Sequence, residues 1–479
     1  MLLPLLVVLP AILGAAAFAM RSLEWKLRLL VCGAAAHAAL TAAAWFVPPP
    51  PAPALGLALD PLGLTFLTIA SALFLAAAVH SLGYVPRESR APETTGRYVP
   101  SLFLFLAAMT LAAESAHFGL LWVAIEATTL ASAPLVSYQR THGALEAMWK
   151  YLLLCSVGIA LSLLGTFFLG FAFANRPPDE QSLWLAALLA AAPTADPAWL
   201  RAAFLLAAVG YGTKMGLAPL HTWLPDAHSE APSPVSALLS GALLNCAFLG
   251  ILRFFQVAVA AGAGALARDV LLVLGLVSLA VAAGSILGQR DYKRLLAYSS
   301  VENMGIVAVG IGVGGGASYG ALFHAVNHSL AKAMLFLLAG NVLLAYHTKT
   351  ASEVRGVSRE LPATGALLLA GLFAIGGLPP FGLFQSELTI LLAALASDRI
   401  VVAVAFLALV AIAFVGFAAM LLPMTSGRRT VAEPAAPPES WLLVGPPLLL
   451  GAAVLVLGVW VPPGIDGVLR SAAALLGTP

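Results

Sequence analysis

Apolar runs long enough to cross a bilayer recur along the whole of this 479-residue chain, and no other feature constrains its fold as much. A membrane-spanning α-helix needs about 20 mostly apolar residues. Only 10% of the residues are charged and 61% are hydrophobic, whereas about a quarter of the residues in soluble proteins are charged. A soluble protein with a very large core would not repeat such runs from end to end. We therefore expect an all-α polytopic membrane protein.

The apolar runs predict 14 membrane-spanning helices. They lie at about 2–20, 27–47, 61–84, 99–115, 117–138, 148–173, 199–219, 232–257, 268–288, 294–314, 318–346, 363–394, 400–422 and 441–461. A further apolar stretch near 183–192 is too short to cross, and we expect it to lie at the membrane interface. The first run lacks a leading basic region and a convincing cleavage motif, so it is expected to be a span and not a signal peptide.

Lysines and arginines are distributed unevenly between the loops. When 14 spans alternate in direction, one set of loops holds 16 of these residues and the other set holds 6. Basic loops stay on the cytoplasmic side. We therefore expect a multi-pass protein of the inner (cytoplasmic) membrane with both termini on the non-cytoplasmic side, and an odd number of spans would break the pattern.

Two spans are interrupted in a similar way. The seventh breaks at GYGTKMGLAPL and carries Lys214, and the twelfth breaks at AIGGLPPFGLF and carries Glu387. Matching interrupted helices in two halves of a transporter indicate inverted repeats with a transport route between them. We expect two inverted five-helix repeats, formed by helices 4–8 and 9–13. The corresponding segments are a three-helix N-terminal part at 1–98, a first half-channel at 99–257, a second half-channel at 268–422 and a C-terminal helix at 441–461.

Several polar or ionisable residues lie inside the spans, where a charge costs at least ~2.5–3.5 kcal/mol. In chain order they are Glu126, Lys214, Asn245, His324, His328, Lys332 and Glu387. The residues at 324, 328 and 332 follow i, i+4, i+8 spacing and share one helix face. A Glu–Lys pair whose separation changes switches the lysine between holding and releasing a proton, and histidines can relay that proton. This series predicts a proton route.

Structural roles remain as alternatives. Glu126 and Lys214 could form an ion pair that only pins two helices, the His–Lys stripe could be polar packing, and Glu387 could cap the second break. His221 and His228, beside prolines at a cytoplasmic boundary, fit either proton uptake or loop fixing. Glu302 could instead reach the cytoplasmic interface.

The sequence shows no motif for a bound cofactor. Cys32, Cys155 and Cys246 all fall inside apolar spans without CxxC spacing, and there is no haem-attachment site or phosphate-binding loop. We expect no cofactor and no metal site in this chain, and the lack of a basic tract argues against nucleic acid. A pathway for Na⁺ would be lined by oxygen ligands and not by lysines, so H⁺ is the expected ion.

Four stretches resemble a known family. KMGLAPLHTWLPDAHSEAPSPVSALLSG is similar to the signature of the antiporter-like, proton-conducting membrane subunits of respiratory complex I, multi-subunit Na⁺/H⁺ antiporters and membrane-bound [NiFe] hydrogenases. QRDYKRLLAYSSVENMG, HAVNHSLAKAMLFLLAG and GLPPFGLFQSE match further parts of the same family, and the resemblance covers roughly 60–425. It implies 14 core helices with the same two inverted repeats, and other membrane and peripheral subunits as partners.

The resemblance also implies roles for individual residues. Glu126 looks like the family's helix-five glutamate, Lys214 like the helix-seven lysine and Lys332 like the lysine of the second half-channel. Glu387 occupies the helix-twelve position, where members carry lysine or glutamate. Asn245 stands where many members have a central lysine. Asn303 stands where many members have a histidine. Neither of these two amide side chains can ionise.

Within the family, WVAIEATTLASAPLV and GLPPFGLFQSE look most like the F component of hydrogenase-4. The expected function is proton translocation in a redox-driven complex whose electron transfer takes place in partner subunits. Two alternatives stay open. One is the antiporter-like partner in a two-component complex for CO₂ or bicarbonate uptake, and the other is a complex I or Na⁺/H⁺ antiporter subunit.

Overall fold

The computed structural model describes residues 1–88, 92–175, 182–427 and 438–477 of the chain. The helices run in chain order as α1 Leu2–Ala19, α2 Leu23–Phe46, α3 Pro61–Tyr84, α4 Pro92–Glu114, α5 Phe118–Val136, α6 His142–Ala172, α7 Leu185–Ala190, α8 Pro197–Met215, α9 Trp223–Glu230, α10 Ser233–Leu238, α11 Leu244–Ala260, α12 Gly264–Leu287, α13 Tyr292–Val313, α14 Gly316–Tyr346, α15 Val357–Glu360, α16 Pro362–Ile375, α17 Gly382–Ala396, α18 Ile400–Thr425, α19 Trp441–Val459 and α20 Pro463–Ala474. Short 3₁₀ turns occur at η1 Pro53–Leu55, η3 Ala192–Thr194 and η5 Ala351–Glu353, and η4 Leu239–Leu243 is π-helical.

The all-α fold with 14 spans is confirmed. Within the described residues, 12 helices are long and apolar enough to cross a membrane. The other two crossings are the interrupted ones, formed by α8 with α9 and by α16 with α17. The short apolar stretch after the sixth span forms α7, as expected. The amphipathic helix α20, which follows the last span, was not anticipated from the sequence.

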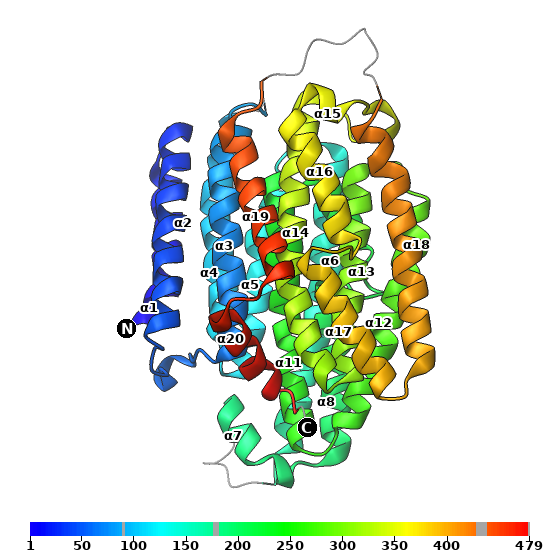
Figure 1. Cartoon of the computed structure of the whole chain (residues 1–479). Helices are drawn as coiled ribbons and strands as arrows, with labels where there is room; N and C mark the ends of the chain where they lie inside the picture. The colour runs from blue at the N-terminus through cyan, green and yellow to red at the C-terminus, as the bar shows by residue number, and fades with distance from the viewer. Residues whose placement is uncertain (89–91, 176–181, 428–437, 478–479) are drawn as a thin grey trace.

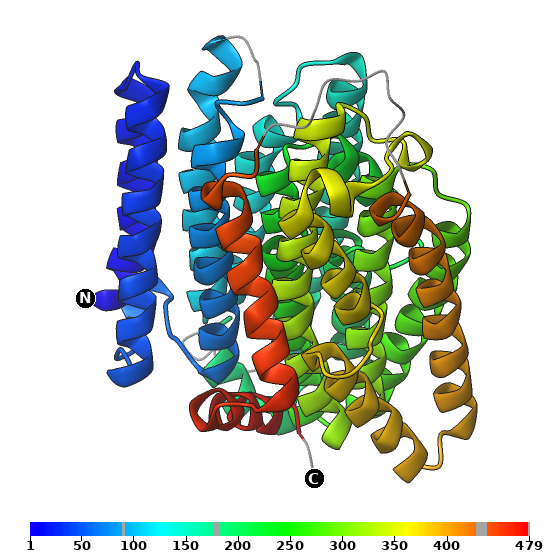
Figure 2. The ribbon, with the colours of Figure 1, turned by 45° about the horizontal axis from the view of Figure 1, so that its top comes forward.

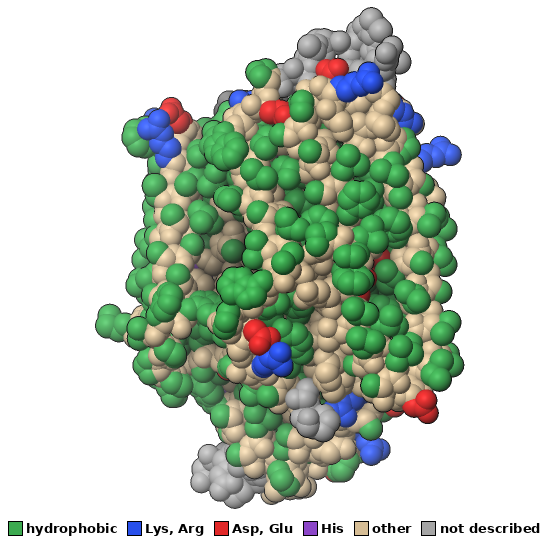
Figure 3. Space-filling view, in the orientation of Figure 1, with side chains coloured by type: hydrophobic (Ala, Val, Ile, Leu, Met, Phe, Trp, Pro, Cys, Tyr) green, Lys and Arg blue, Asp and Glu red, His purple; other side chains and the backbone are tan. Residues whose placement is uncertain are grey.

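The helices stand side by side as one bundle (Figure 1). The α1–α2 hairpin forms one edge, α14 and α19 lie near the centre, and α12 and α18 form the opposite edge. α20 lies across one end of the bundle, as Figure 2 shows. Large apolar side chains cover the visible flank between the two ends (Figure 3), and on α18 Val401, Val404 and Val415 are all exposed. Such an apolar flank is typical of a surface that faces lipid.

Helix packing follows the pattern that two five-helix repeats predict. α4 packs on α5 as α12 packs on α13, and α6 packs on α8 as α14 packs on α17. Small residues allow these close approaches: a side chain at Gly210 of α8 would collide with the Gly158 carbonyl and Ser162 of α6. The segment boundaries at 98/99, 257/268 and 422/441 stay predictions.

The break in the seventh span is stabilised by neighbouring groups. α8 ends at Met215, and Gly216 adopts a left-handed conformation with φ of 84°. Beyond it, the Ala218 amide donates to Ser278 Oγ of α12 at 2.9 Å, and Trp223 Nε1 donates to the Thr213 carbonyl at 2.8 Å. Backbone groups freed at membrane depth need such partners, because hydrocarbon offers none.

The break in the twelfth span has the same character. α16 ends at Ile375, Gly377 has a φ of +64°, and the Leu378 amide donates to the Phe373 carbonyl at 3.0 Å. α17 then starts at Gly382, where any side chain would collide with the Asn327 amide of α14. Both breaks also contain a cis X–Pro peptide, at Ala218–Pro219 and Pro379–Pro380.

Candidate functional site

Lys214 lies in the last turn of α8 and is fully buried. Its Nζ donates to the Ile125 carbonyl and to Thr129 Oγ1, two groups one turn apart on α5. The side chain is therefore held by a neutral carbonyl and a neutral hydroxyl.

Glu126 and Lys214 make no direct ion pair, which was the structural alternative considered from the sequence. Its Oε1 accepts a hydrogen bond from Ser156 Oγ of α6 at 2.9 Å, and its Oε2 accepts one from Thr129 Oγ1 at 3.3 Å. Thr129 thus accepts from the lysine and donates to the carboxylate. The reason is geometric: Glu126 and Thr129 lie one turn apart on the same helix face, and the hydroxyl occupies the space between lysine and acid.

Asn245 lies between the two halves of the protein, on α11. It is buried, and its Nδ2 donates to the Gly241 carbonyl at 2.8 Å and to Ser329 Oγ of α14 at 2.7 Å. Its Oδ1 has no hydrogen-bond partner among the described residues. The π-helical turn η4 directly precedes Asn245, and such turns occur often at functional sites.

His324 and His328 form a histidine chain on α14 in which, among the described residues, only His324 is hydrogen-bonded. The two ring nitrogens of His324 pair with Ser386 Oγ of α17 at 2.9 Å and with Asn303 Oδ1 of α13 at 3.0 Å. The His328 ring stacks on that of His324 with centroids 6.5 Å apart. Neither ring nitrogen of His328 meets a well-aligned partner within the described part of the chain. A buried imidazole without partners is a place for water or for a proton.

Lys332 repeats the arrangement of Lys214. It is fully buried, and its Nζ donates to the Leu296 carbonyl and, at 2.5 Å, to Ser299 Oγ, which lies one turn away on α13. The Nζ also lies 5.1 Å from the centre of the Phe336 ring, a cation–π distance. Asn303 joins this site to the histidine chain, because its Nδ2 donates to the Ser299 carbonyl at 2.7 Å.

His228 belongs to the same neighbourhood, which the sequence did not indicate. It is fully buried and stacks on Phe336, with ring centroids 4.8 Å apart and planes at 13°. Its two nitrogens have no hydrogen-bond partner in the described segments. His221 lies in the loop between α8 and α9, where its ring meets Tyr298 edge-on at 6.2 Å. The two histidines therefore differ in position, and only His228 shares an aromatic ring with Lys332.

Two carboxyl groups complete the second half. Glu387 lies on α17 against the break, close enough that a side chain at Gly377 would collide with its carboxyl group. Glu302 is buried on α13, and its Oε2 has no hydrogen-bond partner among the described residues. Glu302 therefore does not reach the interface, which was the alternative considered from the sequence.

The end of α9 is fixed by basic residues from two other elements. Lys293 Nζ donates to the Ser229 and Ala231 carbonyls at 3.2 and 2.6 Å, and Lys349 Nζ pairs with Glu230 at 2.8 Å. Cations stabilise the exposed carbonyls at a helix C-terminus. This contact holds the helix that carries His228 in place.

Sequence reasoning missed the neutral residues of the route: Thr129, Ser156, Ser299, Ser329 and Ser386. A weak signal was available, because Thr129 lies one turn from Glu126 and Ser386 is adjacent to Glu387. In the part of the chain that the structure describes, no group of three or more His, Cys, Asp or Glu side chains could hold a metal ion.

Comparison with known families identifies the chain's relatives. The sequence pattern of the family described as "NADH:quinone oxidoreductase/Mrp antiporter, TM" matches residues 115–413, more than half of the chain. The chain belongs to this family. The hydrogenase-4 component F homolog of Methylacidiphilum infernorum is 39% identical to this antiporter-like subunit over 72% of the chain and 74% of the relative.

Two other relatives extend this result. NADH-quinone oxidoreductase subunit N of Desulforudis audaxviator is 30% identical over 88% of the chain and 85% of its own length. Hydrogenase-4 component B of Escherichia coli is 32% identical over 73% of the chain, which spans about half (52%) of that relative. These names do not favour the CO₂ or bicarbonate uptake alternative.

Solved structures show the same fold. A chain of respiratory complex I from Thermus thermophilus matches with a TM-score of 0.79 and 25% identity, over 96% of this subunit and 97% of that chain. A chain of the archaeal membrane-bound sulfane sulfur reductase matches with a TM-score of 0.87 and 22% identity, over 99% and 98%. The latter likeness concerns the fold alone.

Proposed function

We propose that this antiporter-like subunit translocates protons across the membrane within a redox-driven complex of the hydrogenase-4 or complex I type. The observation that carries the proposal is the setting of its two buried lysines. Lys214 and Lys332 each donate to a main-chain carbonyl and a hydroxyl, and not directly to a carboxylate. A lysine held in this way leaves no uncompensated buried charge behind when it releases its proton.

In the first half, Thr129 supports proton exchange between Lys214 and Glu126. The ammonium passes a proton to the Thr129 oxygen while the Thr129 hydroxyl proton moves to the carboxylate. The products are a neutral amine, an intact hydroxyl and a neutral carboxylic acid, so the protons balance. Both charges disappear together, which suits a site of low dielectric constant.

In the second half, the proton passes along α14. Lys332 and His228 share the Phe336 ring, and His324 connects towards Ser386, the neighbour of Glu387. A neutral imidazole both donates and accepts a hydrogen bond, so each histidine can hand a proton on. Glu387, beside the helix break, is the terminal carboxylate of this half.

The two halves meet at Asn245. An amide cannot carry the proton itself, but its unpartnered Oδ1 provides an acceptor for a bridging water at the centre of the bundle. Asn245 thus supports a water-mediated link from the Lys214 side to Ser329 and the α14 stripe.

Two further observations bear on the orientation of the subunit and on its partners. The 16-to-6 distribution of basic residues supports both termini on the non-cytoplasmic side of the inner membrane. The relatives named above are components of hydrogenase-4 and of quinone oxidoreductases, which supports partner subunits that carry out the electron transfer. This chain would convert their conformational or electrostatic change into proton movement, without a cofactor of its own.

Proton flux in proteoliposomes tests the proposal. The purified complex is reconstituted with a trapped pH dye, and a potassium diffusion potential drives flux without any redox substrate. Lys214→Met and Lys332→Met should each abolish flux, whereas the control Lys150→Met should not, because Lys150 is a surface residue paired with Glu146 and Asp226. Wild-type flux from Lys214→Met in an assembled complex would refute the proposal, and flux that requires Na⁺ would refute H⁺ as the ion.

A further inference from the structure

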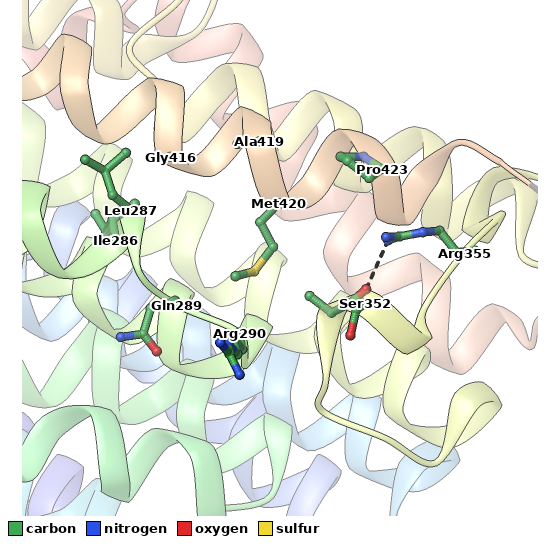
Figure 4. Close-up of a pocket in the computed structure, with 11 residues that line it drawn as sticks. Ile286, Leu287, Gln289, Arg290, Ser352, Arg355, Gly416, Ala419, Met420 and Pro423 are labelled. Atoms are coloured by element: carbon green, nitrogen blue, oxygen red, sulfur yellow. Dashed lines mark hydrogen bonds between the residues drawn. The ribbon is translucent and has the colours of Figure 1, made fainter.

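A pocket of about 410 Å³ lies where α12 and α18 end beside the η5 turn. Figure 4 shows its wall, which has an apolar part and a polar part. Leu287, Ala419, Met420 and Pro423 belong to the apolar part. The pocket lies at the end of the bundle that carries α15 (Figure 1), outside the proton route described above.

The apolar part opens towards the lipid-facing flank. Leu287 is 57% exposed and Leu422, on the same helix as the lining residues, is 42% exposed. α18 approaches α12 closely because Gly416 leaves room for Ile286: a side chain at Gly416 would meet the Ile286 side chain at 2.5 Å. The α12–α18 groove is the part of this pocket that lies between the two helices, and exposed apolar side chains flank it.

Among the described residues, the polar part carries two arginines and no acid. Arg355 uses its Nη1 group to bind the Ala351 and Val354 carbonyls, both at 3.1 Å, which leaves its Nη2 group for another acceptor. Arg290 is exposed, and its side chain makes no hydrogen bond or ion pair with the described residues. Gln289 and Ser352 add further polar groups, and none of the lining residues is Asp or Glu.

We propose that this pocket binds an anionic phospholipid, with its phosphate between Arg290 and Arg355 and an acyl chain along the α12–α18 groove. Guanidinium groups bind phosphate through several N–H donors at once. The apolar part suits an acyl chain, which free phosphate lacks, and the described lining offers no acidic residue to receive the choline of a zwitterionic lipid. A basic pocket between helices on the cytoplasmic side matches the leaflet in which anionic lipids carry the surface charge.

Lipid titration of the delipidated complex, followed by native mass spectrometry, tests this site. We expect phosphatidylglycerol to bind well above phosphatidylcholine, and Arg290→Gln/Arg355→Gln to weaken its binding roughly 30-fold, since each basic residue near an anionic surface contributes about five-fold. Ala419→Leu, at an exposed lining position, should weaken phosphatidylglycerol by narrowing the groove. Arg359→Gln, on α15 and outside the pocket wall, is the matched control and should leave binding unchanged.

Other results would overturn the proposal. Equal binding of the two lipids, or an equal loss in Arg359→Gln, would mean that no specific site exists. Displacement of the lipid by millimolar inorganic phosphate would assign the arginines to a soluble anion. A copurified subunit that protects the pocket wall from chemical labelling would identify a protein as its occupant. A changed melting temperature of the lipid-free double arginine variant would show a folding defect. In that case Ala419→Leu, which leaves both arginines in place, tests lipid binding independently.

Discussion

The Thr129 hydroxyl contacts both the Lys214 amine and the Glu126 carboxylate, so its removal tests the first half of the route most sharply. Thr129→Val keeps the branched shape of the side chain and loses only the oxygen. The lysine then keeps the Ile125 carbonyl, and Glu126 keeps Ser156 at 2.9 Å. We expect the variant to fold and to translocate protons slowly.

The magnitude follows from the lost contact. A hydrogen bond to a charged group contributes about 1.5–3 kcal/mol. At 1.36 kcal/mol for each factor of ten, proton translocation should slow by roughly 10- to 150-fold. Thr129→Ser retains the hydroxyl oxygen, so its rate of proton translocation should stay within about three-fold of the wild-type rate. A three-fold change in rate corresponds to well under 1 kcal/mol.

The assay is dye-reported proton flux in proteoliposomes under an imposed potential. Thr166→Val is the matched control: Thr166 is buried on α6, and its hydroxyl only bonds back to the Ser162 carbonyl of its own helix at 2.9 Å. Thr129→Val at the wild-type rate would refute the role of the hydroxyl. A Thr129→Ser variant as slow as Thr129→Val would assign the effect to packing.

Three further changes test other parts of the structure. Ser299→Ala removes the hydroxyl that accepts a hydrogen bond from Lys332, so proton flux should fall by about the same factor as in Thr129→Val. Ser299→Thr keeps the hydroxyl and is the control. Asn245→Leu should lower proton flux about ten-fold, which corresponds to the loss of roughly 1.4 kcal/mol of hydrogen bonding at the central link. Asn245→Lys should preserve the flux. Equal flux in both variants would show that the two halves work independently. Asp60→Asn should lower the stability of the protein by about 1.5–3 kcal/mol, because Arg253 loses its negatively charged partner and keeps Gln256, as thermal unfolding at neutral pH would show.

The same ion pair predicts a pH dependence of stability. Asp60 precedes α3 and binds Arg253 through two hydrogen bonds, at 2.5 and 2.8 Å. Burial alone raises the pKa of Asp60, but the charge and hydrogen bonds of Arg253 outweigh it and hold the pKa below its ordinary value. The stabilisation is therefore complete above the ordinary aspartate pKa, about 4, and is lost as the pH falls through the lower folded-state pKa. The stability difference between wild type and Asp60→Asn should shrink over that acidic range, and a constant difference would contradict this assignment.

Much of the fold follows from one-dimensional patterns. Span length predicted the crossings because a bilayer has a fixed thickness, and glycine and proline predicted both breaks because they cannot continue a regular helix at those positions. α20 was missed, since twelve residues of mixed polarity resemble an ordinary loop or tail in sequence. The π-helical turn η4 was also missed, because Leu239–Leu243 contains no proline and a single glycine is tolerated in a regular helix.

The site was predictable only where charge marked it. Lys214, Lys332 and Glu387 are conspicuous because charge is rare in apolar helices, but the hydroxyls of Thr129 and Ser299 are not, since such residues commonly bond back to their own helix. Which hydroxyl faces a lysine depends on how helices rotate against each other. His228 shows the same limit: its ring meets Phe336 of α14, far away in sequence, because of how α9 packs on α6 and α13.

The Asp60–Arg253 ion pair shows how Lys214 and Lys332 differ from charges that only stabilise the fold. Arg253 is 3% exposed and meets the 30% exposed Asp60 carboxylate directly through two hydrogen bonds, an arrangement that keeps both groups charged at neutral pH. Neither Lys214 nor Lys332 has such a partner. Each ammonium meets neutral oxygens: the Glu126 carboxylate lies one contact beyond Thr129, and His324 lies two contacts beyond Ser299, through Asn303. In a pair like Asp60–Arg253 the cation would hold its proton too firmly to release it, because losing that proton leaves the carboxylate as a bare charge in a medium of low dielectric constant. Neutral contacts stabilise the ammonium less, which keeps its charged and neutral forms closer in free energy. That difference supports proton transfer over an inert scaffold as the role of the two lysines.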